Sequence, residues 1–259
     1  MTERLIEKRE GAVGWLIFNN PERRNAISLD MWQGIPSVLE DFEKDSNIRV
    51  VVLAGAGDKA FVSGADISQF EKERSSEEAV KRYEEIGEAA QAKLAAFEKP
   101  VIAMIRGYCL GGGLNIANSC DLRIAAEDAR FGIPAAKMGL GYRASSMKKL
   151  VDTVGAPFAR EIMITARQFN AAEALHMGLV HKVVEKEKLE EVVREYTDAI
   201  AANAPLTMRA AKRIIREVSR HDYDAAACDA WVKECFASED YAEGRRAFME
   251  KRKPQFRGR

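Results

Sequence analysis

Short apolar runs that end in glycine-rich loops constrain this chain most. Residues 48–54 and 101–105 are largely apolar, as expected of parallel strands that are buried on both faces. The first run ends at Gly55-Ala56-Gly57, and a loop from Gly107 to Gly113 follows the second and opens a predicted helix. Because parallel strands need long crossover connections, usually helices, the first half of the chain predicts an α/β fold.

Strands nearly vanish after about residue 140, where helical periodicity becomes the main signal. Two amphipathic helices are indicated by apolar residues at helical spacing, namely Leu189, Val192, Tyr196 and Ile200, then Leu206, Ala210, Ile214 and Val218. Residues 223–236 and 239–251 predict two more helices. The sequence has no linker rich in Pro, Gly and Ser between these parts, so the helical third is expected to continue directly from the α/β body.

The charge balance excludes one class of partner. The 259 residues include 40 Lys and Arg against 40 Asp and Glu, so the net charge is zero. Proteins that bind nucleic acid by neutralising phosphates are usually basic, so no nucleic-acid partner is expected. The apolar runs are far shorter than the ~20 residues of a membrane span, so no membrane partner is expected either.

Cysteine and histidine usage indicates neither a disulfide framework nor a metal site. The chain has four cysteines, none in CxxC spacing, and three histidines, which gives no zinc-ligand pattern. Reduced thiols and the lack of a recognisable signal peptide favour a cytoplasmic location.

Two strand-to-helix junctions are the strongest functional signal. One is Ser63-Gly64-Ala65-Asp66, and the other is the loop from Gly107 to Gly113. Their spacings match neither GxGxxG nor the phosphate-binding GxxxxGK[ST] pattern, so nucleotide binding is only weakly indicated. Each junction can instead offer one backbone N–H group to a shared oxyanion.

These segments carry a family resemblance. The sequence resembles the crotonase (enoyl-CoA hydratase/isomerase) superfamily along nearly its whole length. The matching segments are residues 20–27, 60–67, 99–113, 120–121, 131–134, 171–180 and 248–254.

The resemblance implies a crotonase-like spiral of ββα units over residues 1–195 and a helical C-terminal trimerisation region over 196–259. It also implies a homotrimer or homohexamer, an acyl-CoA substrate, and a place in fatty-acid metabolism. CoA would be part of the substrate, so no separate cofactor is expected. The oxyanion hole of the family would be formed here by the backbone N–H groups of Ala65 and Gly112.

The same resemblance assigns CoA contacts. Residues near the nucleotide and adenine would be Arg23, Arg24, Ala26, Ala65, Asp66 and Ile67, whereas Phe248 and Lys251 would reach CoA across a subunit interface. Local positive charge from Arg23-Arg24 and from the basic residues after position 250 would suit the phosphates of CoA.

The chain departs from the family at both catalytic glutamates. Hydratases of this family use two glutamates as general base and general acid, and those positions are Asn115 and Ala135 here. Neither side chain titrates at neutral pH, so we predict poor hydration by the usual route. An acyl-CoA lyase that works through an oxyanion-stabilised thioester enolate, and that would still be labelled an enoyl-CoA hydratase, is the leading hypothesis.

Two alternatives remain open. Decarboxylases of the superfamily carry a tyrosine at the position that Tyr142 occupies, so Tyr142 favours a malonyl-type (methylmalonyl-like) CoA decarboxylase. Arg143 could then pair with a substrate carboxylate. The other alternative is a non-catalytic CoA-binding or scaffold protein.

Structural roles are predicted for several other polar residues. We expect Asp121 to bond backbone, Asp66 to cap a helix, Cys109 to be a small buried residue, and His176 and His181 to be structural. The mixed-charge stretch over residues 71–88 predicts a solvated helix face.

Overall fold

Two sheets form the centre of the body. The computed structural model describes residues 2–66 and 76–259. The larger sheet has the strand order β1-β2-β3-β5-β7-β10, from Leu5–Glu10, Val13–Phe18, Val50–Gly55, Val101–Ile105, Leu122–Ala126 and Lys182–Val184. The smaller sheet has the order β4-β6-β8-β9, from Ala60–Val62, Tyr108–Leu110, Arg130–Gly132 and Phe169–Asn170. All neighbours are parallel except β1–β2 and β8–β9.

A repeated ββα unit generates both sheets. β3 and β4 precede α3 (Glu77–Ala96), β5 and β6 precede α4 (Gly112–Ala117), and β7 and β8 precede α5 (Ala144–Thr165). In each unit the first strand joins the larger sheet and the second strand joins the smaller one. The predicted spiral of ββα units is therefore confirmed. The remaining body helices are α1 (Leu29–Lys44), α6 (Ala171–His176) and α7 (Leu189–Ala201), with 3₁₀ turns at Pro21–Arg23, Pro134–Met138 and Lys186–Lys188.

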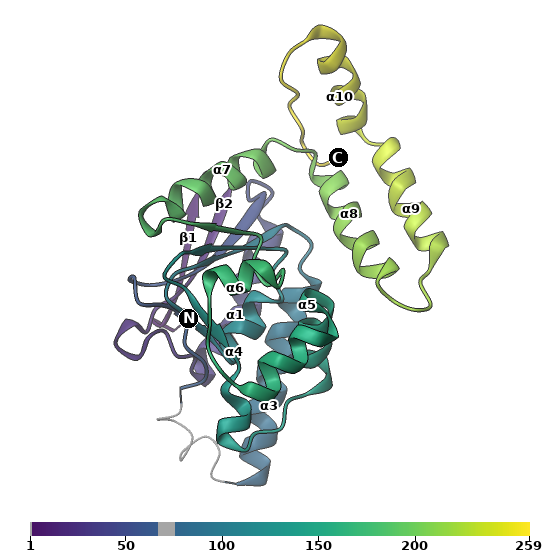
Figure 1. Cartoon of the computed structure of the whole chain (residues 1–259). Coiled ribbons are helices and arrows are strands. Elements are labelled where there is room, and N and C mark those ends of the chain that lie inside the picture. Colours follow the sequence, from purple (N-terminus) through teal and green to yellow (C-terminus); the bar gives the residue numbers. More distant parts are fainter. Residues whose placement is uncertain (1, 67–75) are drawn as a thin grey trace.

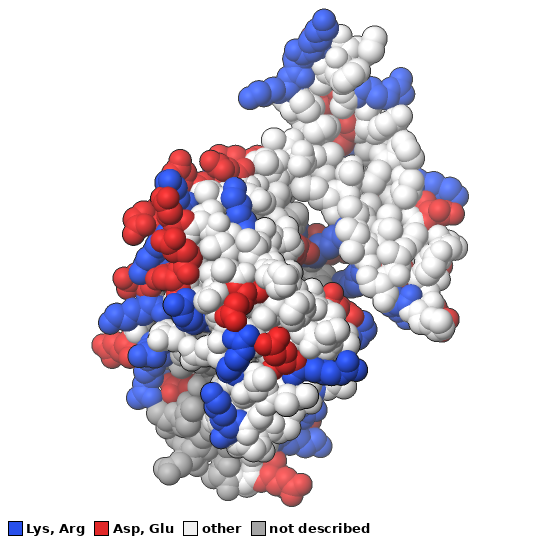
Figure 2. Space-filling model, in the orientation of Figure 1, with Lys and Arg blue, Asp and Glu red and all other residues white. Residues whose placement is uncertain are grey.

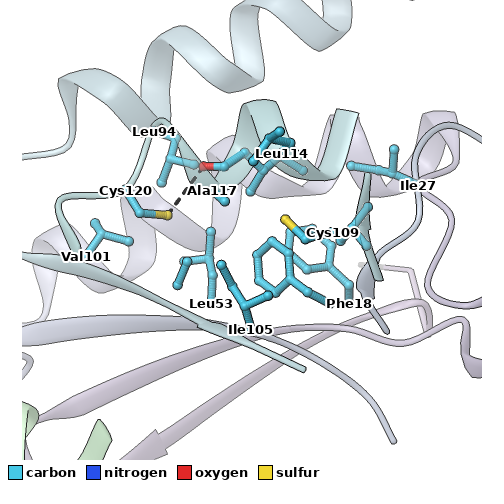
Figure 3. Close-up of a cluster of buried hydrophobic side chains, with 14 of the residues drawn as sticks. Phe18, Ile27, Leu53, Leu94, Val101, Ile105, Cys109, Leu114, Ala117 and Cys120 are labelled. Carbon is cyan, nitrogen blue, oxygen red and sulfur yellow. Dashed lines mark hydrogen bonds between the residues drawn. The ribbon is translucent and has the colours of Figure 1, made fainter. Parts of the chain in front are cut away.

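The main core lies between the sheets and the helices α1, α3 and α4. The apolar strands β3 and β5 are almost completely buried, as their composition predicts. Figure 3 shows Leu114 and Ala117 of α4 lying over Leu53 and Ile105 of the larger sheet. Apolar burial of this kind contributes about 25 cal/mol per Å², so the short helix α4 is held mainly by tertiary packing.

Helix α7 covers the opposite face of the larger sheet. Its Leu189 and Val193 are fully buried in a second core cluster, against which Val192, Tyr196 and Ile200 pack. The predicted boundary at residue 195 falls within α7.

The last three helices form an arm that projects from the body (Figure 1). They are α8 (Pro205–Val218), α9 (Ala225–Phe236) and α10 (Glu239–Glu250). Ion pairs attach the arm to the body: Lys212 contacts Asp121 at 2.7 Å, and Arg213 pairs with Glu98. Asp121 also accepts a 2.7 Å hydrogen bond from the Val101 N–H, so its predicted backbone-bonding role is confirmed.

Charged side chains are unevenly distributed over the molecule. In the view of Figure 2, Asp and Glu gather on the body over α7 and β1, whereas Lys and Arg dominate the outer end of the arm, near the end of α10. No helix among the described residues is long and apolar enough to cross a membrane.

Arg123 of β7 is a buried cation whose guanidinium bonds backbone carbonyls among the described residues. It donates to Leu179 O at 2.7 Å, Cys120 O at 2.8 Å and Ala117 O at 3.3 Å. Its side chain thereby ties the C-terminal end of α4 to the loop before β10.

Replacing Arg123 should therefore destabilise the body. We predict that Arg123→Met lowers the free energy of unfolding by about 3 kcal/mol, because it leaves buried carbonyls without donors. Chemical denaturation measures this loss. The exposed Arg130, whose guanidinium donates to the carbonyls of Asp128 and Ala129, gives the control Arg130→Met with an expected change within about 0.5 kcal/mol. Equal midpoints for the two variants would contradict the prediction.

Candidate active site

A cavity of about 250 Å³ lies where the two strand-to-helix junctions meet. Its walls come from the loop after β4, the start of α4, the 3₁₀ turn after β8, the start of α5, and one side of α3. The residues that line the cavity include Ala65, Tyr83, Glu84, Glu88, Gly112, Asn115, Ala135, Tyr142, Arg143 and Ser146. The structure therefore brings the predicted catalytic residues Ala65, Gly112, Asn115 and Tyr142 to one cavity.

Backbone geometry leaves the N–H groups of Ala65 and Gly112 available. Ile27 bonds the neighbours of Ala65 on both sides, through Ile27 N to Gly64 O at 2.8 Å and Asp66 N to Ile27 O at 2.9 Å. The N–H of Ala65 consequently points away from Ile27. Gly112 is the first residue of α4, where an N–H has no carbonyl partner within the helix. Within the described residues, neither N–H donates a backbone hydrogen bond outside regular elements.

Glycine is required at Gly113 by close packing. A Cβ atom there would lie 2.1 Å from the carbonyl oxygen of Val62 in β4. The preceding Gly111 has a φ of +51°, which disfavours other residues. These two glycines let α4 start directly against β4, and so place Gly112 beside the loop that holds Ala65.

Two of the buried side chains that line the cavity are neutral. Asn115 is buried, and its Nδ2 donates to Ser146 Oγ at 3.3 Å. Ala135 is buried as well and offers only a methyl group. Both side chains thus face the cavity without a titratable group.

The Tyr142 hydroxyl is buried and has no hydrogen-bond partner among the described residues. The Asn115 amide lies beside it, but not in hydrogen-bonding geometry. Burial raises the pKa of the Tyr142 phenol, so the group remains protonated and acts as a neutral hydrogen-bond donor or acceptor.

Arg143 is held by two carboxylates at the rim of the cavity. It pairs with Glu84, and its Nε lies 3.4 Å from Glu88 Oε1. Both glutamates come from α3 and line the cavity. Residues 71–75 of the predicted solvated face lie outside the described part, and Glu84 and Glu88 are 39% exposed, in keeping with that prediction. The structure adds that these two glutamates also line the cavity. In the sequence, the i, i+4 spacing of these glutamates indicates that they share one helix face. It does not indicate whether that face borders a cavity or solvent alone.

The residues near the N-terminus that are predicted to contact the nucleotide part of CoA do not line this cavity. Arg23 forms a 3.1 Å ion pair with the buried Asp66, and the Arg24 guanidinium lies 4.8 Å from the centre of the Tyr108 ring. Ala26 is buried, and its carbonyl accepts from Asn20 Nδ2. Ile67 and the helix that Asp66 is predicted to cap lie outside the described residues.

Phe248 and Lys251 lie on the arm, away from this cavity. Phe248 is 83% exposed and lines an apolar groove between the arm helices. Lys251 ends α10 in a left-handed conformation with φ of 53°. The two residues do not meet the active-site cavity within one chain.

The remaining predicted structural residues have local partners. His181 Nδ1 accepts from the Arg123 N–H at 3.1 Å, and burial lowers the pKa of His181. His176 packs edge-on against Phe158. Cys109 is fully buried, and burial raises its thiol pKa, which confirms it as a buried core residue.

Within the described residues, no cluster of three or more His, Cys, Asp or Glu side chains is arranged to hold a metal ion.

Comparisons with known proteins agree with this architecture. The family model described as "Enoyl-CoA hydratase/isomerase" matches residues 8–259. The short-chain-enoyl-CoA hydratase of Clostridium acetobutylicum is 38% identical over 96% of this chain and 95% of its own. The crotonyl-CoA hydratase of Syntrophomonas wolfei is 36% identical over 98% of each.

Solved structures give the same result. A crystal structure from Magnetospirillum magneticum, titled an enoyl-CoA hydratase/carnithine racemase, superposes with a TM-score of 0.94 at 36% identity, covering 100% of this chain and 97% of that one. The fold is thus that of the crotonase superfamily. The chain belongs to the enoyl-CoA hydratase/isomerase family.

The contact of Gly113 with β4 can be tested by paired substitutions. We predict that Gly113→Ala lowers the free energy of unfolding by at least about 2 kcal/mol, because the added methyl group forces α4 away from β4. Gly112→Ala is the control, because its Cβ would meet only Trp32 and Ile27 at 3.7 and 3.9 Å. Denaturation midpoints should separate the two variants, and a Gly113→Ala midpoint at or above that of Gly112→Ala would contradict the packing argument.

Proposed function

We propose that this enzyme binds an acyl-CoA thioester and stabilises its enolate with the N–H groups of Ala65 and Gly112. The observation that carries this proposal is that Ala65 and Gly112 both line one cavity, and that neither N–H donates a described backbone hydrogen bond outside regular elements. Backbone donors of this kind hold negative charge on the thioester oxygen as it develops, and each is worth about 10²–10³ in rate. The reaction class is that of a lyase, with CoA supplied as part of the substrate.

Hydration of short 2-enoyl-CoA substrates should be slow. Addition of water needs a base to activate the water and an acid to protonate the α-carbon, and the usual positions for both are Asn115 and Ala135. An amide can orient water but cannot take its proton. The enolate site is therefore retained while the usual machinery for water addition is absent.

Because Asn115 and Ala135 replace both usual glutamates, we predict a low hydration rate with crotonyl-CoA. Compared with a family member that has both glutamates, the turnover number should be lower by about 10²–10⁴, the usual contribution of general acid–base catalysis. Loss of absorbance of the conjugated thioester measures the reaction. The double variant Asn115→Glu/Ala135→Glu should raise the rate, whereas Lys137→Glu, a nearby exposed substitution, should not. Equal hydration rates for the wild-type enzyme and for the family member with both glutamates would contradict the prediction.

A second candidate reaction is decarboxylation of a malonyl-type CoA. The specific observation that favours it is the buried, unpaired hydroxyl of Tyr142 beside the amide of Asn115. These two neutral groups can bond a substrate carboxylate, and the departing carboxylate supplies the electrons of the enolate, so no base is needed to form it. Arg143 is already paired with Glu84 and Glu88, which weakens its expected role as the carboxylate partner.

Removing the single hydroxyl group of Tyr142 tests the decarboxylation reaction without disturbing the structure. We predict that carbon dioxide release from methylmalonyl-CoA falls by at least about tenfold in Tyr142→Phe, as expected when one hydrogen bond to a charged group is lost. The melting temperature should not change, because the hydroxyl bonds no described residue. Tyr108→Phe, outside the cavity lining, is the matched control. Absence of release from a panel of malonyl-type thioesters would remove this candidate.

A scaffold role without catalysis would require that acyl-CoA binds but is never turned over. A mass-spectrometric screen of acyl-CoA thioesters distinguishes that alternative, because it reports any mass change whichever reaction occurs. The two retained amide donors favour catalysis.

We further propose that the arm assembles the chain into a trimer or hexamer. Large apolar side chains are exposed there, including Ile215, Phe236, Phe248 and Met249 at 60–83% exposure. Surfaces of this kind usually mark an interaction site. Assembly would also let Phe248 and Lys251 reach CoA bound by a neighbouring copy. Light scattering gives the mass, and a monomer at working concentration would contradict this.

A further inference from the structure

Two carboxylates enter the cavity from a helix that carries neither of the usual catalytic positions. Glu84 and Glu88 lie one turn apart on α3, and both line the cavity, as do Gly111 and Gly112 of the glycine loop. Among the described lining residues they are the only carboxylates. Their side chains are 39% exposed, so they stand at the rim, in reach of both substrate and solvent.

Enolate chemistry needs a group that exchanges a proton with the α-carbon. Asn115 and Ala135 do not titrate, and the buried Tyr142 phenol is held in its protonated form. Arg143 is a permanent cation under working conditions. Of the described side chains that line the cavity, only Glu84 and Glu88 therefore carry a carboxylate that could exchange a proton with a substrate.

Their hydrogen bonds distinguish the two glutamates. Glu88 Oε1 accepts from Ser145 Oγ at 3.3 Å, and the next residue, Ser146, accepts from Asn115 Nδ2 at 3.3 Å. Adjacent serines at the start of α5 thus hold Glu88 and Asn115. Glu84 pairs with Arg143, as Glu88 does, but has no described hydrogen bond to these serines.

We propose that Glu88 is the proton-transfer residue of this cavity, and that it compensates from α3 for the glutamate absent at position 115. This inference rests on the proposed enolate function. In the forward step the α-carbon–hydrogen bond breaks and its electron pair moves into the thioester, giving an enolate oxygen between the amides of Ala65 and Gly112. The proton goes to the Glu88 carboxylate. The reverse step returns it, so no co-reactant is consumed.

Arg143 is the positioning residue in this arrangement. Its Nε lies 3.4 Å from Glu88 Oε1 while another of its nitrogens bonds Glu84. One guanidinium thus spans two carboxylates and restricts the rotamers of Glu88 at the rim.

Exchange of the α-protons in heavy water tests the assignment without requiring the natural reaction. Purified enzyme is incubated with butyryl-CoA in D₂O, and mass spectrometry follows the gain of deuterium. The wild-type enzyme should exchange. Glu88→Gln should slow exchange by at least about 100-fold while butyryl-CoA binding, measured by calorimetry, stays within about threefold of wild type. Glu88→Asp should recover part of the rate, because it restores a carboxylate on a shorter side chain.

Two neighbouring variants serve as controls. Glu85→Gln removes a carboxylate from the same helix that does not line the cavity and pairs with Lys81, so exchange should be unchanged. Glu84→Gln should reduce exchange by less than about tenfold, as expected for an indirect effect through Arg143.

The outcomes separate this inference from the proposed function. Exchange at the wild-type rate in a folded Glu88→Gln enzyme would overturn the assignment and leave the enolate function intact. An equal loss in Glu84→Gln would also overturn it, since the two glutamates would then be equivalent. A wild-type enzyme that binds butyryl-CoA and never exchanges would contradict both the enolate function and the role of Glu88.

Discussion

The contact between Gly113 and Val62 is the constraint on which the site depends. Because residue 113 has no side chain, α4 starts against the backbone of β4, and the first N–H of the helix comes to lie beside the loop that follows β4. That loop carries Ala65. The two amide donors are thus brought together by packing between consecutive ββα units, and any substitution that separates α4 from β4 separates the donors as well.

Backbone donors and side-chain acids respond differently to sequence change. The N–H groups of Ala65 and Gly112 remain whatever side chains surround them, provided that the turn and the packing are kept. A carboxylate at position 115 or 135 disappears with a single substitution. This difference explains how the fold, the cavity and the amide pair can persist in a chain whose two usual catalytic positions are Asn and Ala.

Much of this architecture follows from local sequence signals, and the rest depends on tertiary contacts. The buried strands β3 and β5 are predicted from their apolar runs, and the two junctions from their glycines. The position of Glu88 on the cavity wall is not predictable, because a glutamate at i, i+4 spacing looks the same on an exposed face and on a cavity wall. The pairing of Arg143 with α3 joins residues 55 or more positions apart, which no local pattern specifies. The arm contacts of Glu98 and Asp121 are hidden for the same reason.

The charges at the rim also bear on which acyl group fits the cavity. Two carboxylates on α3 and one guanidinium leave the rim net negative, and the guanidinium is already satisfied by both carboxylates. A free carboxylate on the substrate must therefore pass Glu84 and Glu88 and find its partners at the neutral groups of Tyr142 and Asn115. An uncharged acyl chain meets no such barrier, and the base proposed for its α-protons, Glu88, belongs to the same rim. For the proposed enolate function, the charges at the rim therefore predict a preference for neutral acyl-CoA thioesters over substrates with a free carboxylate.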